Sequence, residues 1–273
     1  MPSLERNGVR LAYQVSGAGK PVVMVMGSGA GGRVWHLHQV PALVAAGYQV
    51  ITFDNRGIAG SGLGDGRFTI QDMADDIAEL VNHLRLAPCA VIGFSLGAFV
   101  VQELLLTHPD LVDRGVLMAT RGRDDAFRAA ISAADRTLHD DNGKVPAAYR
   151  AVATMARSLS RATLNDESLA LDWLEILEVS DVDHPGYRRQ LELDSMPDRL
   201  ADYRAITVPT MVLAFAEDVL CPPHLAREVA DAIPGAAFTE VPGCGHFGYL
   251  ERPDEVNSRL LDFLADKLDM FRR

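Results

Sequence analysis

Residues 89–105 read CAVIGFSLGAFVVQELL, and this stretch decides the fold that the sequence predicts. The apolar run Ala90 to Ile92 predicts a buried strand, and an apolar helical face begins soon after it. Between the two, Gly93, Ser95 and Gly97 form the pattern G-x-S-x-G at a strand-to-helix reversal. So short a reversal strains the backbone at the serine, and such strain is tolerated mostly at functional sites. We therefore predict an exposed nucleophilic hydroxyl at Ser95; the alternative is a small-residue turn with an incidental serine.

Strands and helices alternate on both sides of this turn. Apolar or alternating runs predict strands at Val9–Val15, Val22–Met26, Tyr48–Phe53, Gly115–Ala119, Pro209–Phe215 and Ala237–Val241. Helical spacing of apolar residues predicts helices at Trp35–Ala46, Thr69–Leu84 and Pro253–Leu268. This alternation is typical of the α/β class with a doubly wound, mostly parallel sheet.

The pattern changes from about Arg121 to Ile206, where strand runs vanish and charged helical segments replace them. We interpret residues 121–206 as a helical cap inserted into a core made of residues 1–120 and 207–273. A leucine-rich helix of the cap is expected to roof the serine, and such a roof suits a neutral, mostly apolar small molecule. The residues of this predicted roof are Leu169, Leu171, Leu174, Ile176 and Leu177.

Composition narrows the possible partners. The chain has 273 residues, and 26 basic against 37 acidic side chains give a net charge of −11, which disfavours nucleic acid. No apolar run approaches the length of a membrane span, and the first residues lack a signal-peptide pattern. Three cysteines, too few and odd in number for a disulfide framework, indicate the cytoplasm. We expect a small-molecule substrate, no nucleic acid and no membrane, and the sequence does not set the oligomeric state.

Residues 27–32, GSGAGG, offer a different interpretation, because they satisfy G-x-G-x-x-G after a strand and Asp54 ends the next strand. On spacing alone this is a dinucleotide-binding fingerprint. An apolar helical face begins only after Arg33, however, and Pro41 interrupts the long helix that the fingerprint requires. No Tyr-x-x-x-Lys pair occurs in the chain. We therefore favour a structural turn at 54–57 and expect no cofactor and no metal.

A serine nucleophile needs a general base, and the base needs an orienting carboxylate. Of the eight histidines, only His246 follows a late strand, in the glycine-rich loop VPGCGHF at residues 241–247. The acid is expected at the end of the preceding strand, where Glu217 and Asp218 stand side by side. We favour Asp218 because the chain turns away directly after it, and Glu217 stays open as the alternative.

The oxyanion hole is expected to use the backbone N–H of Leu96, directly after the nucleophile. A second backbone N–H is expected from the glycine-rich loop after Val22–Met26, at Ser28, where amides can point at a developing negative charge. The predicted substrate contacts are Trp35, Trp173 and Phe247, and for Trp35 the core is the alternative.

Taken together, the chain resembles the α/β-hydrolase superfamily. The matching segments are VVMVMGSG, FDNRGIAGS, GFSLG, AEDVLCPP and PGCGHFGYLERP, in that order along nearly the whole chain. The resemblance implies an eight-stranded, mostly parallel sheet with the cap inserted after the sixth strand. Two departures stand out: Met26 where relatives commonly have histidine, and Ala59 where they have glycine. A serine at the elbow argues against dehalogenase and epoxide hydrolase relatives, which use aspartate there.

The predicted function is hydrolysis of an ester, thioester or lactone of a mostly apolar small molecule through an acyl-enzyme. A C–C bond hydrolase, a perhydrolase or a lyase on the same scaffold stays open as the alternative. A nicotinamide-dependent oxidoreductase and a non-catalytic small-molecule binder are two further classes, and the order of Ser95, Asp218 and His246 argues against both.

Overall fold

Eight strands form one sheet in the order β1-β2-β4-β3-β5-β6-β7-β8 in the computed structural model, which describes residues 1–6, 8–140, 145–180 and 184–266. The strands are β1 (Ser3–Arg6), β2 (Val9–Ser16), β3 (Lys20–Val25), β4 (Tyr48–Phe53), β5 (Cys89–Phe94), β6 (Val112–Met118), β7 (Thr210–Phe215) and β8 (Ala237–Val241). The pairs β1–β2 and β2–β4 are antiparallel and every other pair is parallel. The predicted α/β fold with a mostly parallel sheet is confirmed.

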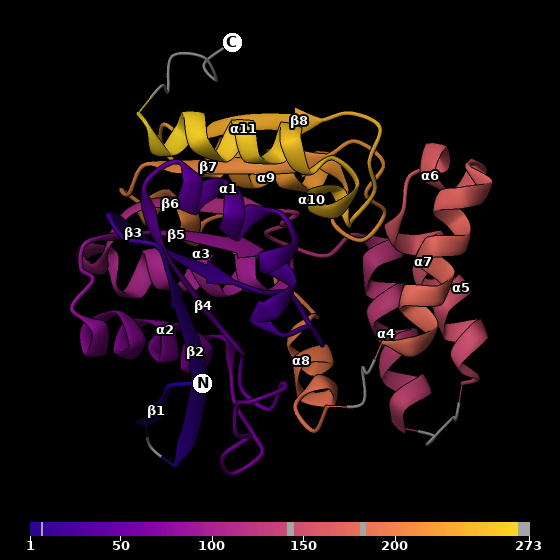
Figure 1. Cartoon of the computed structure of the whole chain (residues 1–273), viewed down its shortest axis with the longest axis horizontal. Coiled ribbons are helices and arrows are strands. Elements are labelled where there is room, and N and C mark those ends of the chain that lie inside the picture. Colours follow the sequence, from indigo (N-terminus) through magenta and orange to yellow (C-terminus); the bar gives the residue numbers. More distant parts are fainter. Residues whose placement is uncertain (7, 141–144, 181–183, 267–273) are drawn as a thin grey trace.

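Two layers of helices cover the sheet (Figure 1). One layer holds α1 (Gln39–Ala45) and α11 (Pro253–Leu264), which contact each other, and the other holds α2 (Ile70–Leu84) and α3 (Leu96–Thr107). The remaining core elements are α9 (Pro223–Ala232), α10 (Gly248–Glu251), and the 3₁₀ turns η1 (Gly32–Leu37) and η2 (Pro109–Leu111). The predicted helix at 35–46 is therefore two elements, which meet at His38; Pro41 lies in the first turn of α1, where a missing N–H costs nothing.

Local sequence explains where α2 begins. The Thr69 side chain accepts a hydrogen bond from the Asp72 backbone, and the Asp72 carboxylate accepts one from the Thr69 backbone, which is a capping box. Six described apolar side chains of this helix are buried against the sheet and α3: Met73, Ala74, Ile77, Ala78, Leu80 and Val81. The predicted start at residue 69 and end at residue 84 are both confirmed within one residue.

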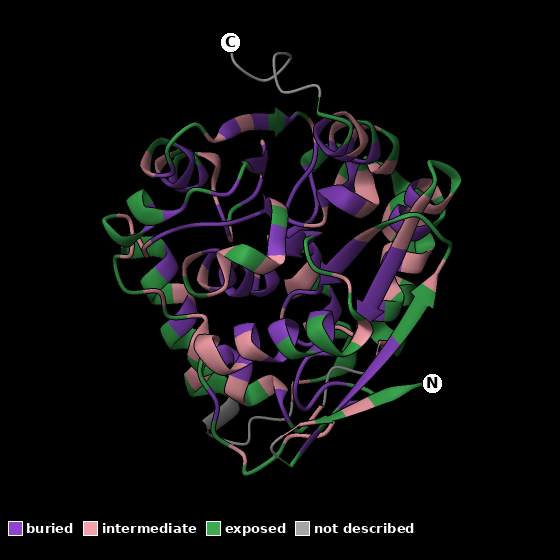
Figure 2. Cartoon of the chain, turned by 90° about the vertical axis from the view of Figure 1, so that its left-hand side faces the viewer, coloured by how far each residue is buried: buried purple, intermediate pink, exposed green. Residues whose placement is uncertain are grey.

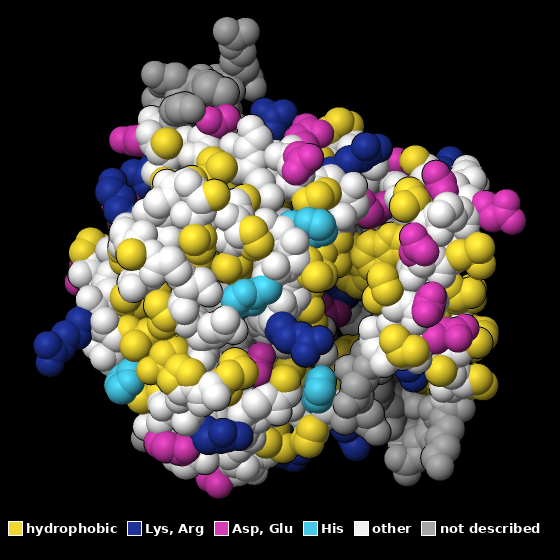
Figure 3. Space-filling model, viewed as in Figure 1, with side chains coloured by type: hydrophobic (Ala, Val, Ile, Leu, Met, Phe, Trp, Pro, Cys, Tyr) yellow, Lys and Arg dark blue, Asp and Glu magenta, His cyan; other side chains and the backbone are white. Residues whose placement is uncertain are grey.

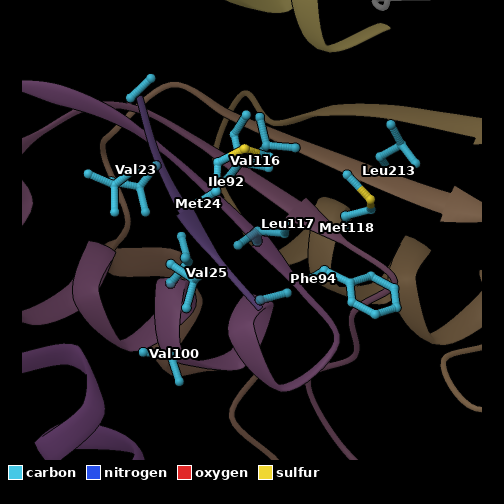
Figure 4. Packing of buried hydrophobic residues seen from close by; sticks show 14 of the residues in the cluster. Val23, Met24, Val25, Ile92, Phe94, Val100, Val116, Leu117, Met118 and Leu213 are labelled. Atoms are coloured by element: carbon cyan, nitrogen blue, oxygen red, sulfur yellow. The ribbon is translucent and has the colours of Figure 1, made fainter. Parts of the chain in front are cut away.

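The central strands are buried on both faces, as parallel strands between helix layers must be. Figure 4 shows side chains of β3, β5, β6 and β7 packing together, among them Val23, Ile92, Val116 and Leu213. Figure 2 shows the same pattern for the chain as a whole, with buried strands inside and exposed residues on the outer faces of the helices. This rigid centre fixes the positions of the loops that follow the strands.

The carboxyl ends of the parallel strands lie side by side. Val25 of β3 is opposite Gly93 of β5, and Phe94 of β5 is opposite Met118 of β6. The loops that follow β3, β5, β7 and β8 therefore meet at one edge of the sheet, which is where open α/β sheets bind their ligands.

Between β6 and β7 the described residues form helices and no strand: α4 (Ala126–Asp140), α5 (Ala147–Ser158), α6 (Arg161–Asn165), α7 (Glu167–Val179), α8 (Tyr187–Leu193) and η3 (Asp202–Ala205). The helices α4 to α7 form a separate group beside the core, whereas α8 lies on the core side (Figure 1). This position after the sixth strand agrees with the expected helical cap, and the domain boundaries at 121 and 206 stay a prediction. None of the helices in the described residues is both long and apolar enough to cross a bilayer.

Candidate active site

The serine at the strand-to-helix turn has a strained backbone. Ser95 has φ 53° and ψ −121°, a region that side-chain-bearing residues rarely adopt and that costs about 1–3 kcal/mol. Its backbone N–H donates to the Met118 carbonyl at 3.0 Å. A Cβ added at Gly93 would overlap the backbone of Gly97, and one at Gly97 would overlap the Val25 carbonyl. The two glycines are therefore required by close packing, which holds the half-buried serine at the start of α3.

His246 lies between Ser95 and Asp218. Its Nδ1 is 2.8 Å from Asp218 Oδ2, and its Nε2 is 3.1 Å from Ser95 Oγ. The other carboxylate oxygen, Asp218 Oδ1, accepts hydrogen bonds from the backbone N–H groups of Leu220 and Cys221, both at 2.8 Å. His246 and Asp218 are only 5% and 3% exposed. The backbone thus orients the carboxylate, and the carboxylate orients the imidazole toward the hydroxyl.

Glu217, the alternative acid, points away from the imidazole. Its Oε2 accepts a hydrogen bond from the backbone N–H of Arg161 at 2.8 Å. Its own backbone N–H donates to the Cys244 carbonyl at 3.0 Å. Of the two neighbouring acids, Asp218 is the one in contact with His246, as the sequence favoured.

The glycine-rich loop after β3 lies against the nucleophile. A Cβ added at Gly27 would be 3.1 Å from the Ser95 Cβ. The Gly29 N–H donates to Gln190 Oε1 of α8 at 2.9 Å, so this amide already has a partner. Among the described residues, neither the N–H of Ser28 nor that of Leu96 at the start of α3 has a hydrogen-bond acceptor. The Ser28 and Leu96 amides therefore stay the predicted donors of the oxyanion hole.

Met26 stands where the resemblance implies histidine. Its side chain is buried, and the Tyr249 hydroxyl lies 4.0 Å from the Met26 sulfur as a donor. Burial raises the pKa of Tyr249, so the phenol keeps its proton. The Met26 carbonyl accepts from Asn55 Nδ2 at 2.8 Å. The loop after β3 thus begins at a residue held by the Asn55 amide and the Tyr249 phenol.

An aromatic cluster packs beneath the imidazole. The ring centroid of Phe94 lies 4.9 Å from that of His246 and 4.5 Å from that of Tyr249. Trp35 continues the cluster, 5.0 Å from Tyr249, and is 0% exposed. In this structure Trp35 therefore takes the core position that the sequence left as its alternative, and a substrate contact for it stays a prediction.

The other two predicted substrate contacts lie together. Trp173 of α7 stacks on Phe247 with ring centroids 5.9 Å apart and an interplanar angle of 22°. Phe247 is in turn 6.1 Å from the His246 ring, centroid to centroid. Space-filling atoms show a hollow between the core and the helical cap with hydrophobic side chains on its walls (Figure 3). An apolar wall thus begins next to the imidazole.

The predicted roof is wrong for three of its five residues. Leu169, Leu171 and Ile176 of α7 are 45%, 61% and 54% exposed. The helix packs on α5 and α6, and its leucines occur on more than one face, so those on the outer face remain in contact with solvent. Trp173 is the side chain of α7 that contacts the His246 loop.

The dinucleotide fingerprint has a structural explanation. The glycines at 27–32 lead into the 3₁₀ turn η1 and not into a long α-helix. The Asp54 carboxylate accepts from the N–H groups of Gly32 and Gly60 at 2.9 and 3.0 Å, so it joins two loops. Arg56 pairs with the buried Asp76. The structural turn favoured from the sequence agrees with these contacts.

Within the described part of the chain, one side-chain set has metal-ligand chemistry. Single ligand atoms of Asp218, Cys221 and His246 lie within 4.8 Å of one another. Metals bind the thiolate form of cysteine, yet burial raises the pKa of Cys221 to about 12. Arg121 Nη1 also lies 3.4 Å from the sulfur. The set therefore suits orientation of the imidazole by the carboxylate better than metal binding.

Sequence reasoning missed three residues around the site: Asn55, Gln190 and Glu251. Asn55 lies in the D-N-R-G turn, which carries a recognisable signal. No sequence pattern points to Gln190 or Glu251, because their hydrogen-bond partners are far away in the sequence or lie in irregular loops.

Comparison with known proteins identifies the class. The model of the alpha/beta hydrolase family matches residues 22–259, and the chain belongs to this family.

Two relatives are similar over nearly their whole length. "Putative non-heme bromoperoxidase BpoC" of Mycobacterium tuberculosis H37Rv is 45% identical over 94% of this chain and 98% of the relative. Its crystal structure superposes with a TM-score of 0.91 over 94% of this chain and 96% of that one. "Putative carbamate hydrolase RutD" of Azorhizobium caulinodans is 31% identical over 97% of this chain and 99% of the relative. A thermophilic esterase of Thermogutta terrifontis is 25% identical, with a TM-score of 0.82 over 95% and 94% of the two chains.

Proposed function

We propose that this protein hydrolyses carboxylic esters, thioesters or lactones of mostly apolar small molecules through an acyl-enzyme on Ser95. The observation that carries the proposal is the unbroken chain of contacts from Asp218 through His246 to Ser95, at 2.8 and 3.1 Å. The similarity to proteins named as a hydrolase and an esterase supports the reaction class.

The chemistry follows from the positions of the three side chains. With its Nδ1 proton held by Asp218, His246 has a free Nε2 lone pair that takes the Ser95 proton as the oxygen attacks the carbonyl carbon. The backbone N–H groups of Leu96 and Ser28 would stabilise the oxyanion, usually a large part of catalysis. The imidazolium then protonates the leaving alcohol, thiol or lactone oxygen. Water, deprotonated by the same imidazole, releases the acid and restores the serine.

The apolar substrate class rests on the stacked pair Trp173 and Phe247, which begins 6.1 Å from the His246 ring. An acyl chain lying on these rings would exchange water for aromatic surface, whereas a charged acyl group lying there would lose hydration. Nucleic acid and membrane partners are not part of the proposal. A cytoplasmic location is proposed on the three cysteines, which are all unpaired and buried.

A panel of p-nitrophenyl esters tests the proposal. We expect kcat/KM to rise at least tenfold from acetate to butyrate or octanoate and to be lowest for the anionic succinate half-ester. The Ser95→Ala variant should lose on the order of 10⁴–10⁶ in kcat with its fold intact. A variant that keeps more than a tenth of the activity would contradict the assignment of Ser95. Equal kcat/KM for all acyl groups would contradict the apolar substrate class.

A second candidate function is perhydrolysis, favoured by the relative named as a non-heme bromoperoxidase. Here hydrogen peroxide replaces water and attacks the acyl-enzyme, which gives a peroxy acid and free Ser95. The peroxy acid would then oxidise bromide and return to the carboxylic acid. Bromination of monochlorodimedone that needs both peroxide and acetate, and that disappears in Ser95→Ala, would support this candidate. Bromination that is unaffected by acetate or by the variant would oppose it.

A further inference from the structure

The corner between α5 and α6 lies directly on the two loops that carry the proposed acid and base. We define this cap corner as residues 158–163. The Phe247 N–H donates to the Ser158 carbonyl at 2.9 Å, on the histidine loop. The Arg161 N–H donates to Glu217 Oε2 at 2.8 Å, on the acid loop. The helical cap is thus joined to residues that are direct neighbours of His246 and Asp218.

One carboxylate, that of Glu251, joins the cap corner to the histidine loop. Its Oε1 accepts three hydrogen bonds, from Ser160 N at 2.9 Å, Ser160 Oγ at 2.8 Å and Thr163 Oγ1 at 2.6 Å. Its Oε2 accepts the Gly245 N–H at 2.7 Å. Gly245 directly precedes His246 in the chain. Four donors from two segments therefore converge on one side chain, and charge-assisted bonds of this kind are the strong ones.

The fit between these segments leaves little room for movement. A Cβ added at Gly245 would lie 2.6 Å from the Ser158 carbonyl oxygen, so the two backbones are in direct contact. Ser158, Leu159 and Ser160 are 3%, 5% and 1% exposed. A shift of the cap corner would therefore be transmitted to Gly245, and from there to the imidazole.

Only a carboxylate satisfies this arrangement. A glutamine at 251 has one acceptor oxygen, so its amide nitrogen would face either the Gly245 N–H or the Ser160 N–H, both of which are donors. One buried N–H would lose its partner in either orientation. This loss is destabilising, because leaving a buried N–H without a partner costs more free energy than one hydrogen bond contributes on balance.

We propose that Glu251 is a positioning residue that locks the His246 loop to the helical cap. Through this lock the ring of Trp173, which belongs to the cap, and the imidazole, which belongs to the core, take up one fixed relative position. This inference rests on the proposed function, since it assigns Glu251 a role in the reaction at Ser95. The hydrogen bonds of Glu251 go to Ser160, Thr163 and Gly245 and not to Ser95 or His246, so its effect on the reaction passes through the loop.

Glu251→Gln tests the proposal, with Glu255→Gln as the matched control. Glu255 lies on α11, is half-exposed and forms an ion pair with Arg259 at 3.4 Å. In Glu251→Gln we expect kcat to fall ten- to a hundredfold with KM for a small ester nearly unchanged. The second-order rate of labelling by a small fluorophosphonate should fall by the same factor. Backbone hydrogen exchange should become faster in the peptides covering 157–165 and 243–252. Glu255→Gln should match the wild type within twofold in all three measurements.

Two outcomes would overturn the proposal. A folded Glu251→Gln with kcat and labelling rate within twofold of the wild type would overturn the proposal, because a merely structural role would lower the melting temperature and leave both rates unchanged. If Glu251→Gln does not fold, the isosteric Thr163→Val variant decides. It removes one of the three cap-side bonds, so it should lower both rates two- to tenfold, and unchanged rates would overturn the proposal.

The failure of the proposed function would look different. A wild type that neither hydrolyses esters nor reacts with the fluorophosphonate would contradict the assignment of Ser95. Hydrogen exchange would still decide whether Glu251 links the two segments, and exchange in Glu251→Gln as slow as in the wild type would overturn the link itself.

Discussion

Replacing Asp218 by asparagine should stop the reaction by fixing the wrong tautomer of His246. In the native protein Asp218 Oδ1 accepts two backbone N–H groups, and Oδ2 faces the imidazole Nδ1 at 2.8 Å. An asparagine at this position would keep its single oxygen on the two backbone donors. Its NH₂ group would then donate to Nδ1, so the ring proton moves to Nε2. With Nε2 protonated, the imidazole has no lone pair for the Ser95 proton.

The size of the effect follows from the hydrogen bonds. Turning the amide around would restore the tautomer but lose both backbone bonds, at about 0.5–1.5 kcal/mol each. A free-energy difference of about 1.36 kcal/mol changes a population ratio tenfold. The penalty of about 1–3 kcal/mol therefore makes the productive amide orientation about five- to 150-fold rarer than the unproductive one. The missing carboxylate charge no longer stabilises the imidazolium, which adds to the loss. We therefore expect kcat to fall by about 10⁴, as for other triad aspartates.

Glu217→Gln is the control, because its amide oxygen can still accept the Arg161 N–H. Both variants should be measured for kcat on the best p-nitrophenyl ester, with folding checked by circular dichroism. The kcat of Glu217→Gln should stay within about fivefold of the wild-type value, since a neutral hydrogen bond to the Arg161 N–H replaces a charged one. If Asp218→Asn keeps more than about 1% of kcat, or if Glu217→Gln is the slower variant, the tautomer argument is wrong.

Four further predictions concern the loop after β3, the helical cap and the buried cysteines. Gln190→Leu removes the acceptor of the Gly29 N–H, so the proposed oxyanion loop should become more mobile and kcat should fall about two- to tenfold. If steady-state kinetics give an unchanged kcat, Gln190 does not hold this loop for catalysis. Trp173→Ala should raise KM for octanoate esters about tenfold more than for acetate, and equal changes for both would show that the ring is not an acyl contact. Burial raises the pKa of all three cysteine thiols from 9.0 to about 12, so the native protein should not react with Ellman's reagent at pH 8, whereas three thiols should react in denaturant. Because the unfolded thiols lose their protons above about pH 9 while the folded ones keep theirs, the free energy of unfolding should fall as pH rises from about 9 to 12, by up to about 1.4 kcal/mol per pH unit for each thiol. Urea titrations that give the same stability at pH 8 and pH 10.5 would contradict that shift.

The sequence predicted those parts of the site that follow directly from strands. Ser95, Asp218 and His246 each come soon after an apolar run, and a parallel sheet brings the carboxyl ends of its strands to one edge. The glycines of the elbow were recognisable because only glycine tolerates the close approach of Val25 and Gly97. Local pattern and global fold agree here, which is why the three side chains singled out from the sequence lie in contact in the structure.

The parts that could not be predicted depend on contacts between distant segments. Strand β1 was missed because its four residues alternate between exposed and half-buried and form no apolar run. Gln190 is 161 residues from Gly29, and Glu251 is 91 residues from Ser160, so no periodicity links either pair. In α7 the leucines surround much of the helix, and spacing alone does not tell which of them packs inward and which, like Leu171, stays exposed.

The most direct test of the central claim is the site of covalent labelling by a fluorophosphonate. The wild-type protein should gain one phosphonyl group by intact mass, and tandem mass spectrometry of the peptide covering residues 89–105 should place it on Ser95. Ser95→Ala should gain none under the same conditions, and Asp218→Asn should react far more slowly than the wild type. A wild-type protein that stays unmodified, or a label on any residue other than Ser95, would contradict the assignment of this serine as the nucleophile.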